Sequence, residues 1–459
     1  MIKTAVLAAV LAVALMFPAW HTMVATTDSV NYLSITDNLA HGRGPVNFIG
    51  KVELVHPFGY SLAMLPFCLA GMSSQRAAFM VNLFSLVAVG LVAFALLRDI
   101  SGSGGWPVTV GALCVMANPA LVTFSGAILS ETLCAALALT FCWFCVKAGK
   151  DARWLAPALV CGSALCFTRY PGLAIVLGGG LFLRTWRDRA VVVLPSLLLM
   201  LGGVILEPMM RPFLTPHGTS LAMVSHIPFG VLEIITGPVA LAALVYLIVK
   251  GRKLTATRIL AGAVALYLLG LTALAIQSRM DPTLDIRLFV PISSVLLLLL
   301  IGLSMRNSRG FMPYLLTALV LAEGYGAVQN AQTQTNSAIK QLNAPCYSQS
   351  PFMRLIRTLP DSVTVYSTSP SAVYLHTGRV TRAIPNTLDR VYADNQTANS
   401  PIDAPARTGG LMVWLARSDP RYAAPSAFVS IAVGDSAMTD TIAGYQELAM
   451  WVRRAPCSR

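Results

Sequence analysis

Charged residues are scarce in this 459-residue chain. They make up 12% of it, whereas soluble globular proteins carry about 25%. Hydrophobic residues make up 56%, and the mean hydropathy is +0.67. These values exclude a soluble globular protein and predict a polytopic membrane protein. The net charge of +13 would suggest nucleic-acid binding in a soluble protein, but in a membrane protein it reflects Lys and Arg kept on the cytoplasmic side.

Several functional motifs are also absent. The sequence has no Walker motif, no GxGxxG after a strand, no GxSxG and no HExxH, so it gives no support to nucleotide-driven cytosolic chemistry. His56, His217 and His226 do not have the spacing of metal ligands, and no metal site is predicted. The stretch FPAWHTM has no small-x-small cleavage site, so we expect the N-terminal apolar run to be a retained helix.

The nine cysteines do not form a metal-binding pattern. Cys142 and Cys145 have helical spacing inside an apolar run, but no second Cys or His pair accompanies them. Most of the others lie in or beside apolar runs, where cysteine packs as a small hydrophobic residue. Cys346 and Cys457 lie outside these runs, and whether they form a disulfide depends on an oxidising compartment.

Long apolar runs dominate the first 329 residues and predict about eleven transmembrane helices. The stretch 56–71 is apolar but short and contains prolines, so we expect a re-entrant or interfacial helix there. The predicted spans are 4–25, 77–97, 106–124, 129–147, 154–168, 171–184, 190–207, 229–249, 258–276, 288–304 and 311–329.

Charge in the connections between these runs orients the chain. Every second connection is rich in Lys and Arg, as in KAGKDAR, RTWRDR and KGRKLTATR, which places it and the N-terminus in the cytoplasm. The first loop, 26–76, then lies outside, with a loop at 208–228 and everything after about residue 330. Chemistry is therefore expected on the outer, periplasmic face.

Residues 330–459 differ in kind from the transmembrane module 1–329. Polar, proline-rich stretches separate short strand-like runs from helical candidates, which predicts a small periplasmic α/β domain. The strand-like runs are 362–367, 410–416 and 428–433, and the helical candidates are 350–360 and 445–454.

The first loop begins with an acidic residue in an unexpected place. Tyr32, Ile35 and Leu39 recur with helical spacing after TTDS, which predicts a short helix along the membrane surface, closed by glycines at 42 and 44. Asp28 is either the N-cap of this helix or a functional carboxylate. Thr26, Thr27 and Ser29 suit the cap equally well, so capping alone does not require an aspartate here. Asp37 lies about 13 Å further along the helix, so we expect it to be solvated and outside any site with Asp28.

Other charged residues lie at the outer ends of predicted spans. Glu131 begins the fourth span, where it is either a functional carboxylate or a first-turn residue favoured by the helix dipole. Arg169 and Tyr170 follow the fifth span, and the stretch QSRMDPTLDIRLFVP contributes Arg279, Asp285 and Arg287. These arginines either bind a phosphate ester at headgroup level or serve as snorkelling residues and local ion-pair partners.

The chain resembles the GT-C superfamily of polytopic glycosyltransferases, near protein mannosyltransferases and lipid A aminoarabinose transferases. The resemblance rests on DSVNYLSITDNLAHGRG, on HPFGYSLAMLPF, on LSETL and on DIRLFVP, and it covers about 330 residues. It implies a sugar transferred from a polyprenyl-phosphate carrier at the non-cytoplasmic face. Relatives carry two adjacent acids in the first loop, whereas here Ser29 follows Asp28, and the participation of Mg or Mn is left open.

The resemblance also implies residue roles. Asp28 would be the general base and Glu131 a second catalytic carboxylate. Independently of the resemblance, the transfer needs cations to stabilise the departing lipid phosphate, and Arg287, with Arg169 or Arg279, would supply them. The remaining predicted substrate contacts are Tyr32, His56, Tyr60, Tyr170 and Asp285.

The sequence therefore predicts an inverting glycosyltransferase of the bacterial inner membrane, acting on a lipid, glycan or protein acceptor. The alternative is a transporter or flippase of lipid-linked sugars, although the polar residues gather at one face rather than at the midplane. A scaffold with a periplasmic binding domain and a different lipid-linked transferase are also compatible with this pattern. A metal-dependent phosphoethanolamine transferase would need more histidines than His376 alone after residue 330.

Overall fold

The structure is a computed structural model. It describes residues 2–20, 23–50, 57–102, 104–205, 254–277, 290–307, 318, 342, 350–367, 369–383, 410–416, 437–442 and 445–452. The chain divides into two compact units, and each is described by itself. Unit 1 comprises Met1–Met23 and Leu54–Gln334, and unit 2 comprises Val24–Glu53 and Thr335–Arg459. The sequence-based boundaries, 1–329 and 330–459, differ from this division in where they place residues 24–53.

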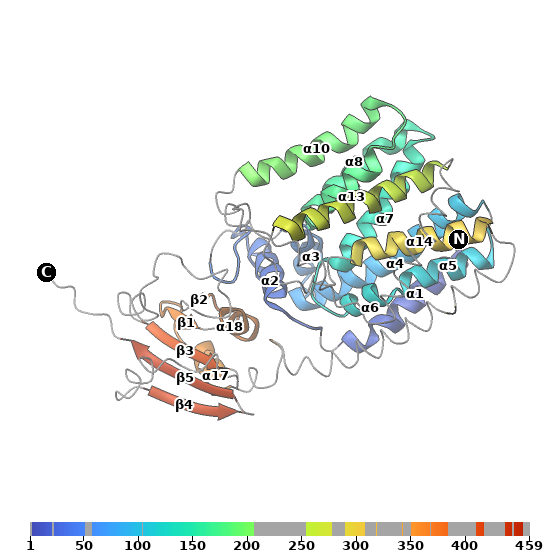
Figure 1. Ribbon diagram of the computed structural model, residues 1–459. Helices are drawn as coiled ribbons and strands as arrows, with labels where there is room; N and C mark the ends of the chain where they lie inside the picture. The colour runs from blue at the N-terminus through green and yellow to red at the C-terminus, as the bar shows by residue number, and fades with distance from the viewer. Residues whose placement is uncertain are drawn as a thin grey trace. The chain divides into compact units, whose positions relative to one another are not determined.

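Unit 1 is helical, and its longer helices run side by side as a bundle (Figure 1). Short 3-10 turns at Phe17–Ala19 and Ala152–Trp154 extend two of the helices. The helices are α1 (Ile2–Met16), α3 (Gly59–Leu69), α4 (Ser74–Ser101), α5 (Trp106–Met116), α6 (Pro119–Ser125), α7 (Glu131–Ala148), α8 (Leu155–Thr168), α9 (Gly172–Gly180), α10 (Trp186–Ile205), α13 (Thr255–Gln277) and α14 (Val290–Asn307).

Three helical stretches in the described part of the chain are long and apolar enough to cross a membrane: Ile2–Ala19, Ser74–Ser101 and Glu131–Ala148. The predicted span 106–124 is two helices, α5 and α6, bent by 54°. Asn118 and Pro119 cause the break, because the Asn118 side chain accepts the Ala120 N–H at 3.0 Å and starts a new helix there. The span 229–249 and nearly all of 311–329 lie outside the described residues, so the count of eleven stays a prediction.

Basic helix ends meet on one side of the bundle. The Lys147 ammonium, near the end of α7, lies 3.4 Å from the Asp99 carboxylate near the end of α4. Arg306, near the end of α14, donates to the Ile100 carbonyl at 3.3 Å. These residues belong to connections that the charge pattern places together in the cytoplasm. Glu131 begins the 18-residue helix α7, so it lies at the opposite end, about 25 Å away.

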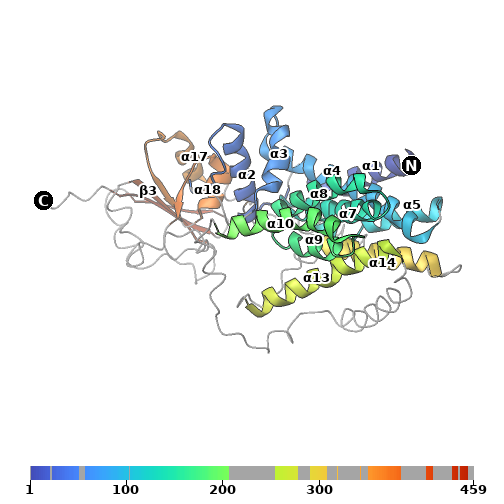
Figure 2. The same ribbon diagram turned by 90° about the horizontal axis from the view of Figure 1, so that it is seen from above.

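Close contact between α9 and α13 depends on glycine. A Cβ at Gly178 would lie 2.2 Å from the Gly262 carbonyl oxygen, and a Cβ at Gly262 would meet the ring of Phe182. Small residues let transmembrane helices approach this closely. Figure 2 shows α13 and α14 side by side along one edge of the bundle.

Gly178→Ala should therefore destabilise unit 1. The added methyl group forces α9 and α13 apart, so we expect a loss of about 1–3 kcal/mol. Thermal unfolding of the purified protein in detergent measures it. Gly104→Ala is the matched control, since nothing lies within 4 Å of a Cβ there. Equal unfolding temperatures for the two variants would contradict the close contact.

Unit 2 is built on a five-stranded mixed sheet in the order β2-β1-β3-β5-β4. β1 pairs in parallel with β2 and β3, whereas β5 pairs antiparallel with β3 and β4. The elements are α2 (Thr27–Ala40), α17 (Pro351–Thr358), β1 (Val365–Ser367), α18 (Pro370–Thr377), β2 (Arg382–Ala383), β3 (Gly410–Ala416), β4 (Ala437–Ile442) and β5 (Tyr445–Val452).

The hydrophobic core of unit 2 includes residues from the first loop. Val30 of α2 and Phe48 are fully buried and join a cluster with Phe352, Val373 and Leu411. Helix α2 packs against α18, and the Thr381 N–H donates to the Phe48 carbonyl at 3.4 Å. The helix expected along the membrane surface is thus a packed part of this unit, and burying a side chain such as Phe48 contributes about 2–3 kcal/mol.

One secondary-structure prediction in this unit is wrong. Residues 445–454 are predicted as a helix, but 445–452 form strand β5. All seven residues of β3, Gly410–Ala416, pair with this strand, and such tertiary pairing overrides intrinsic propensity. The strand predicted at 410–416 and the helix at 350–360 are confirmed, while 428–433 lies outside the described residues.

Candidate active site

Helix α2 carries Asp28 in its first turn but does not use it as the cap. The N-cap is Thr26, whose hydroxyl accepts the Ser29 N–H at 3.3 Å, while the Ser29 hydroxyl accepts the Thr26 N–H at 2.9 Å. This reciprocal pair satisfies two backbone donors. Asp28 is therefore not needed for capping, and its half-buried carboxylate lies where the positive end of the helix dipole stabilises negative charge.

Asp37, near the end of α2, is held within unit 2. The Tyr374 hydroxyl donates to its Oδ2 at 3.4 Å, and Asp37 is half-buried rather than solvated as the sequence suggested. Burial raises the pKa of Tyr374 well above its ordinary value, and the Asp37 carboxylate raises it further. The phenol therefore keeps its proton at neutral pH and remains a donor, which joins α2 to α18.

In unit 1, Glu131 and Arg169 form a buried ion pair. The Arg169 Nη1 lies 2.5 Å from the Glu131 Oε1, and the Arg169 and Glu131 side chains are 19% and 2% exposed. A buried carboxylate needs such a partner, because desolvating an unpaired charge costs several kcal/mol. Glu131 is thus more than a first-turn residue that favours the helix dipole.

The chain geometry around TRYPG fixes Arg169. Helix α8 ends there, with the Arg169 N–H donating to the Leu165 carbonyl and the Arg169 carbonyl accepting the Gly172 N–H at 2.9 Å. A Cβ at Gly172 would lie 2.8 Å from the Leu165 carbonyl oxygen, so the tight turn into α9 requires glycine. The turn leaves the Arg169 side chain beside the first residue of α7.

A buried hydrogen-bond network holds the segment that leads to Glu131. The Asn82 amide of α4 donates to the carbonyls of Ser125 at 2.9 Å and Ala127 at 2.8 Å. The Tyr60 hydroxyl of α3 donates to the Asn82 Oδ1 at 3.0 Å. Both side chains are fully buried, and the substrate contact predicted for Tyr60 stays a prediction.

Two buried oxygen atoms at the start of α7 have no hydrogen-bond partner among the residues that the structure describes. They are the Glu131 Oε2 and the Thr132 Oγ1. Buried polar atoms are rarely left unsatisfied, so the Glu131 Oε2 indicates a place for water or ligand. Tyr267 of α13 is also buried.

The other predicted site residues have varied placements. Tyr32 is 5% exposed on α2, and Tyr170 is half-buried beside Arg169. His56, Arg279, Asp285 and Arg287 lie outside the described residues, so their roles stay predictions.

Sequence reasoning did not select Asn82, Thr132 or Tyr267. Asn82 has a detectable signal, because an amide inside the apolar run 77–97 needs partners. Thr132 and Tyr267 carry no such signal, since both types occur widely in transmembrane helices.

The participation of Mg or Mn beside Asp28, left open by the sequence, stays a prediction. The neighbour Ser29 uses its hydroxyl in the helix cap. Within the described ranges, no three His, Cys, Asp or Glu side chains come close enough to hold a metal ion.

No protein-family model and no curated protein matches the sequence, but solved structures match its fold. ArnT from Cupriavidus metallidurans, bound to undecaprenyl phosphate, has a TM-score of 0.61 and 9% identity over 98% of this chain and 97% of its own. Apo ArnT has a TM-score of 0.62 and 11% identity, covering 97% of each chain. The chain has the fold of ArnT. The resemblance stated from the first-loop motif is thus confirmed at the level of fold.

Another solved structure matches a shorter part of the chain. The oligosaccharyltransferase AglB from Archaeoglobus fulgidus, in complex with an inhibitory peptide and a dolichol-phosphate, has a TM-score of 0.52 and 11% identity. The match covers 84% of this chain and 64% of AglB. The end-to-end agreement with ArnT includes both units, and the chain is an integral membrane protein.

Breaking the buried ion pair should destabilise the protein. In Arg169→Gln, the Glu131 carboxylate stays buried without its partner, so we expect a loss of about 3–5 kcal/mol. The double variant Glu131→Gln/Arg169→Gln should recover part of that loss, because no buried charge remains. Thermal unfolding in detergent measures both.

Arg153→Gln is the matched control. Arg153 pairs with Asp151 at 2.6 Å, but its side chain is 77% exposed, so its loss should cost under about 1 kcal/mol. An Arg169→Gln variant as stable as this control would contradict a buried pair.

Proposed function

We propose that this chain is an inverting glycosyltransferase that moves a sugar from a polyprenyl-phosphate carrier to a lipid, glycan or protein acceptor. The observation that carries the proposal is the shared fold with ArnT over 98% of the chain. ArnT is bound to undecaprenyl phosphate and AglB is in complex with a dolichol-phosphate, so both neighbours hold polyprenyl-type phosphates. The low identity leaves the sugar and the acceptor open.

The reaction needs a base for the acceptor. As the acceptor oxygen or nitrogen attacks C1 of the sugar, the bond from C1 to the phosphate oxygen breaks and its electron pair leaves with the lipid phosphate. We assign Asp28 to accept the acceptor's proton, since the Thr26–Ser29 pair relieves its carboxylate of the capping role. Attack opposite to the departing phosphate inverts C1.

The reaction also needs positive charge near the departing phosphate. We assign this role to Arg169, with Arg279 and Arg287 as further candidates. Glu131 holds the Arg169 guanidinium in one orientation through Oε1, and its Oε2 remains to accept a hydrogen bond from a sugar hydroxyl. No step is assigned to a metal.

The site belongs on the periplasmic face in this proposal. Glu131 lies at the end of α7 opposite Lys147, and positively charged helix ends favour the cytoplasm. The N-terminus is then cytoplasmic and residues 330–459 are periplasmic, in a bacterial inner membrane. Transport is not proposed, because the matching solved structures give it no support.

Replacing the proposed base should abolish transfer without unfolding the protein. Asp28→Asn keeps the shape and removes the proton acceptor, so we expect transfer to fall about 10²- to 10⁴-fold. Purified variants reconstituted in lipid are assayed for release of polyprenyl phosphate from a polyprenyl-phosphate sugar. Their thermal unfolding should match the wild type.

Asp37→Asn is the matched control on the same helix. It also removes a carboxylate from α2 and weakens the contact with Tyr374, but Asp37 has no assigned role in transfer. This variant should keep most of the activity. Full activity in Asp28→Asn, or equal losses in the two variants, would overturn the assignment of the base.

A further inference from the structure

A hollow lined by arginine lies at the opposite end of α7 from Glu131. Its volume is about 380 Å³, within the range of small-molecule sites. Gly149, at the end of α7, lines it with the segment Leu181–Arg184 that follows α9. Arg189 of α10 and the first turn of α13, with Thr255 and Arg258, complete it. All these residues belong to unit 1.

The positive charge of this hollow is not neutralised by the residues described around it. None of the described acidic side chains forms an ion pair with Arg184, Arg189 or Arg258, and no acid is among the lining residues. Asp188, nearby in sequence, instead accepts the Thr185 N–H at 3.1 Å within its own turn. Three arginines that have no acidic partner among the described residues can bind an anion.

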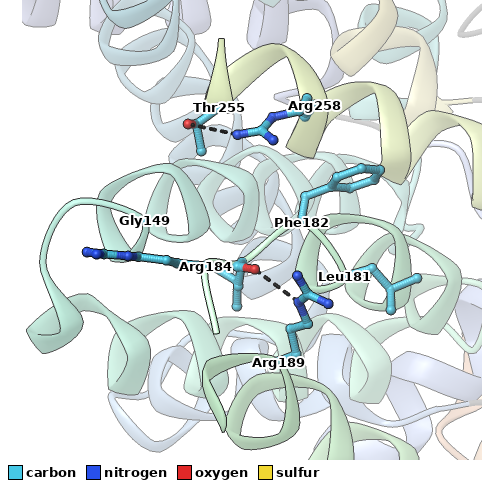
Figure 3. A pocket seen from close by; sticks show the side chains of 8 residues that line it. Gly149, Leu181, Phe182, Arg184, Arg189, Thr255 and Arg258 are labelled. Carbon is cyan, nitrogen blue, oxygen red and sulfur yellow. Dashed lines mark hydrogen bonds between the residues drawn. The ribbon is translucent and has the colours of Figure 1, made fainter. Parts of the chain in front are cut away.

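Two of the arginines are oriented by hydrogen bonds that leave most of their donors available. The Arg189 Nε donates to the Leu183 carbonyl at 3.0 Å, which leaves its two terminal NH₂ groups. One Arg258 terminal nitrogen lies 3.5 Å from the Thr255 hydroxyl. Figure 3 shows Arg189 and Arg258 on either side of Phe182, with Arg184 reaching out to one side. A planar guanidinium group can bind two phosphate oxygens at once through two parallel N–H donors.

One wall of the hollow is apolar and exposed. Leu181 and Phe182 are 49% and 41% exposed, and the Phe182 ring packs over Gly262 of α13. Trp186, at the start of α10, is 72% exposed. Aromatic side chains of this kind lie at the membrane interface, and basic pockets between transmembrane helices bind lipid headgroups there.

We propose that Arg184, Arg189 and Arg258 form a binding site for a phosphate group, distinct from the proposed transfer site. The ligand is the phosphodiester of an anionic lipid headgroup or free phosphate, which share the chemistry that the arginines recognise. The site lies about 25 Å along α7 from Glu131, so its occupancy does not depend on transfer activity.

The test is binding to the purified full-length protein in nonionic detergent. Short-chain phosphatidylglycerol, short-chain phosphatidylcholine and inorganic phosphate are each titrated while the unfolding temperature is followed, since a ligand that binds the folded state raises it. We expect phosphatidylglycerol to raise the unfolding temperature saturably. In Arg189→Gln/Arg258→Gln, the concentration needed for half of this effect should be about tenfold higher. Arg153→Gln, an exposed arginine already paired with Asp151, should behave as the wild type.

The outcomes separate the sources of the phosphate. Competition by inorganic phosphate supports free phosphate as a ligand, whereas stabilisation by phosphatidylglycerol alone supports the lipid. The single variant Arg258→Gln serves if the double variant does not fold, with the same direction of change expected. Equal binding of phosphatidylcholine, unchanged binding in the pocket variants, an equal loss in Arg153→Gln, or no binding of either anion would overturn the proposal.

Discussion

A carboxylate that is 2% exposed inside a helical bundle requires a cation, and Arg169 supplies it to Glu131. Several contacts in unit 1 position the two partners. The turn through Gly172 places Arg169, and Asn82 and Tyr60 hold the segment that delivers Glu131. Arg169 binds the Glu131 Oε1, while the Oε2 has no hydrogen-bond partner among the described residues. Glu131 can therefore stabilise the fold and still be a candidate for substrate contact.

Unit 2 shows how the first loop is anchored. Val30 and Phe48 contribute to its core, and Tyr374 holds Asp37, so α2 is fixed at both ends by the fold of this unit. Asp28 therefore lies on a rigid element, and a general base needs such positioning because proton transfer depends on geometry before pKa. The cap made by Thr26 and Ser29 removes the need for Asp28 to serve the helix.

Local sequence patterns predicted the features that depend only on residues close in the chain, such as helix ends and turns. A capped helix after TTDS, closed by the glycines at 42 and 44, and an apolar helix over 129–147 follow from local patterns, and the structure shows α2 and α7 there. Contacts between distant residues were not predictable in this way. Glu131 and Arg169 are 38 residues apart, Asn82 and Ala127 are 45 apart, and strand β5 depends on pairing with β3. The bend at Asn118 and Pro119 was visible in the sequence but was included in a continuous span.

The central claim is that the chain releases a polyprenyl phosphate by attack at C1 of its sugar. The most direct measurement follows purified wild-type protein in lipid with a polyprenyl-phosphate sugar labelled at C1, using NMR to determine the anomeric configuration of the product. The account predicts release of polyprenyl phosphate and a product whose C1 configuration is inverted. A product with retained configuration would contradict direct attack assisted by Asp28, and no release with any polyprenyl-phosphate sugar would contradict the proposed function itself.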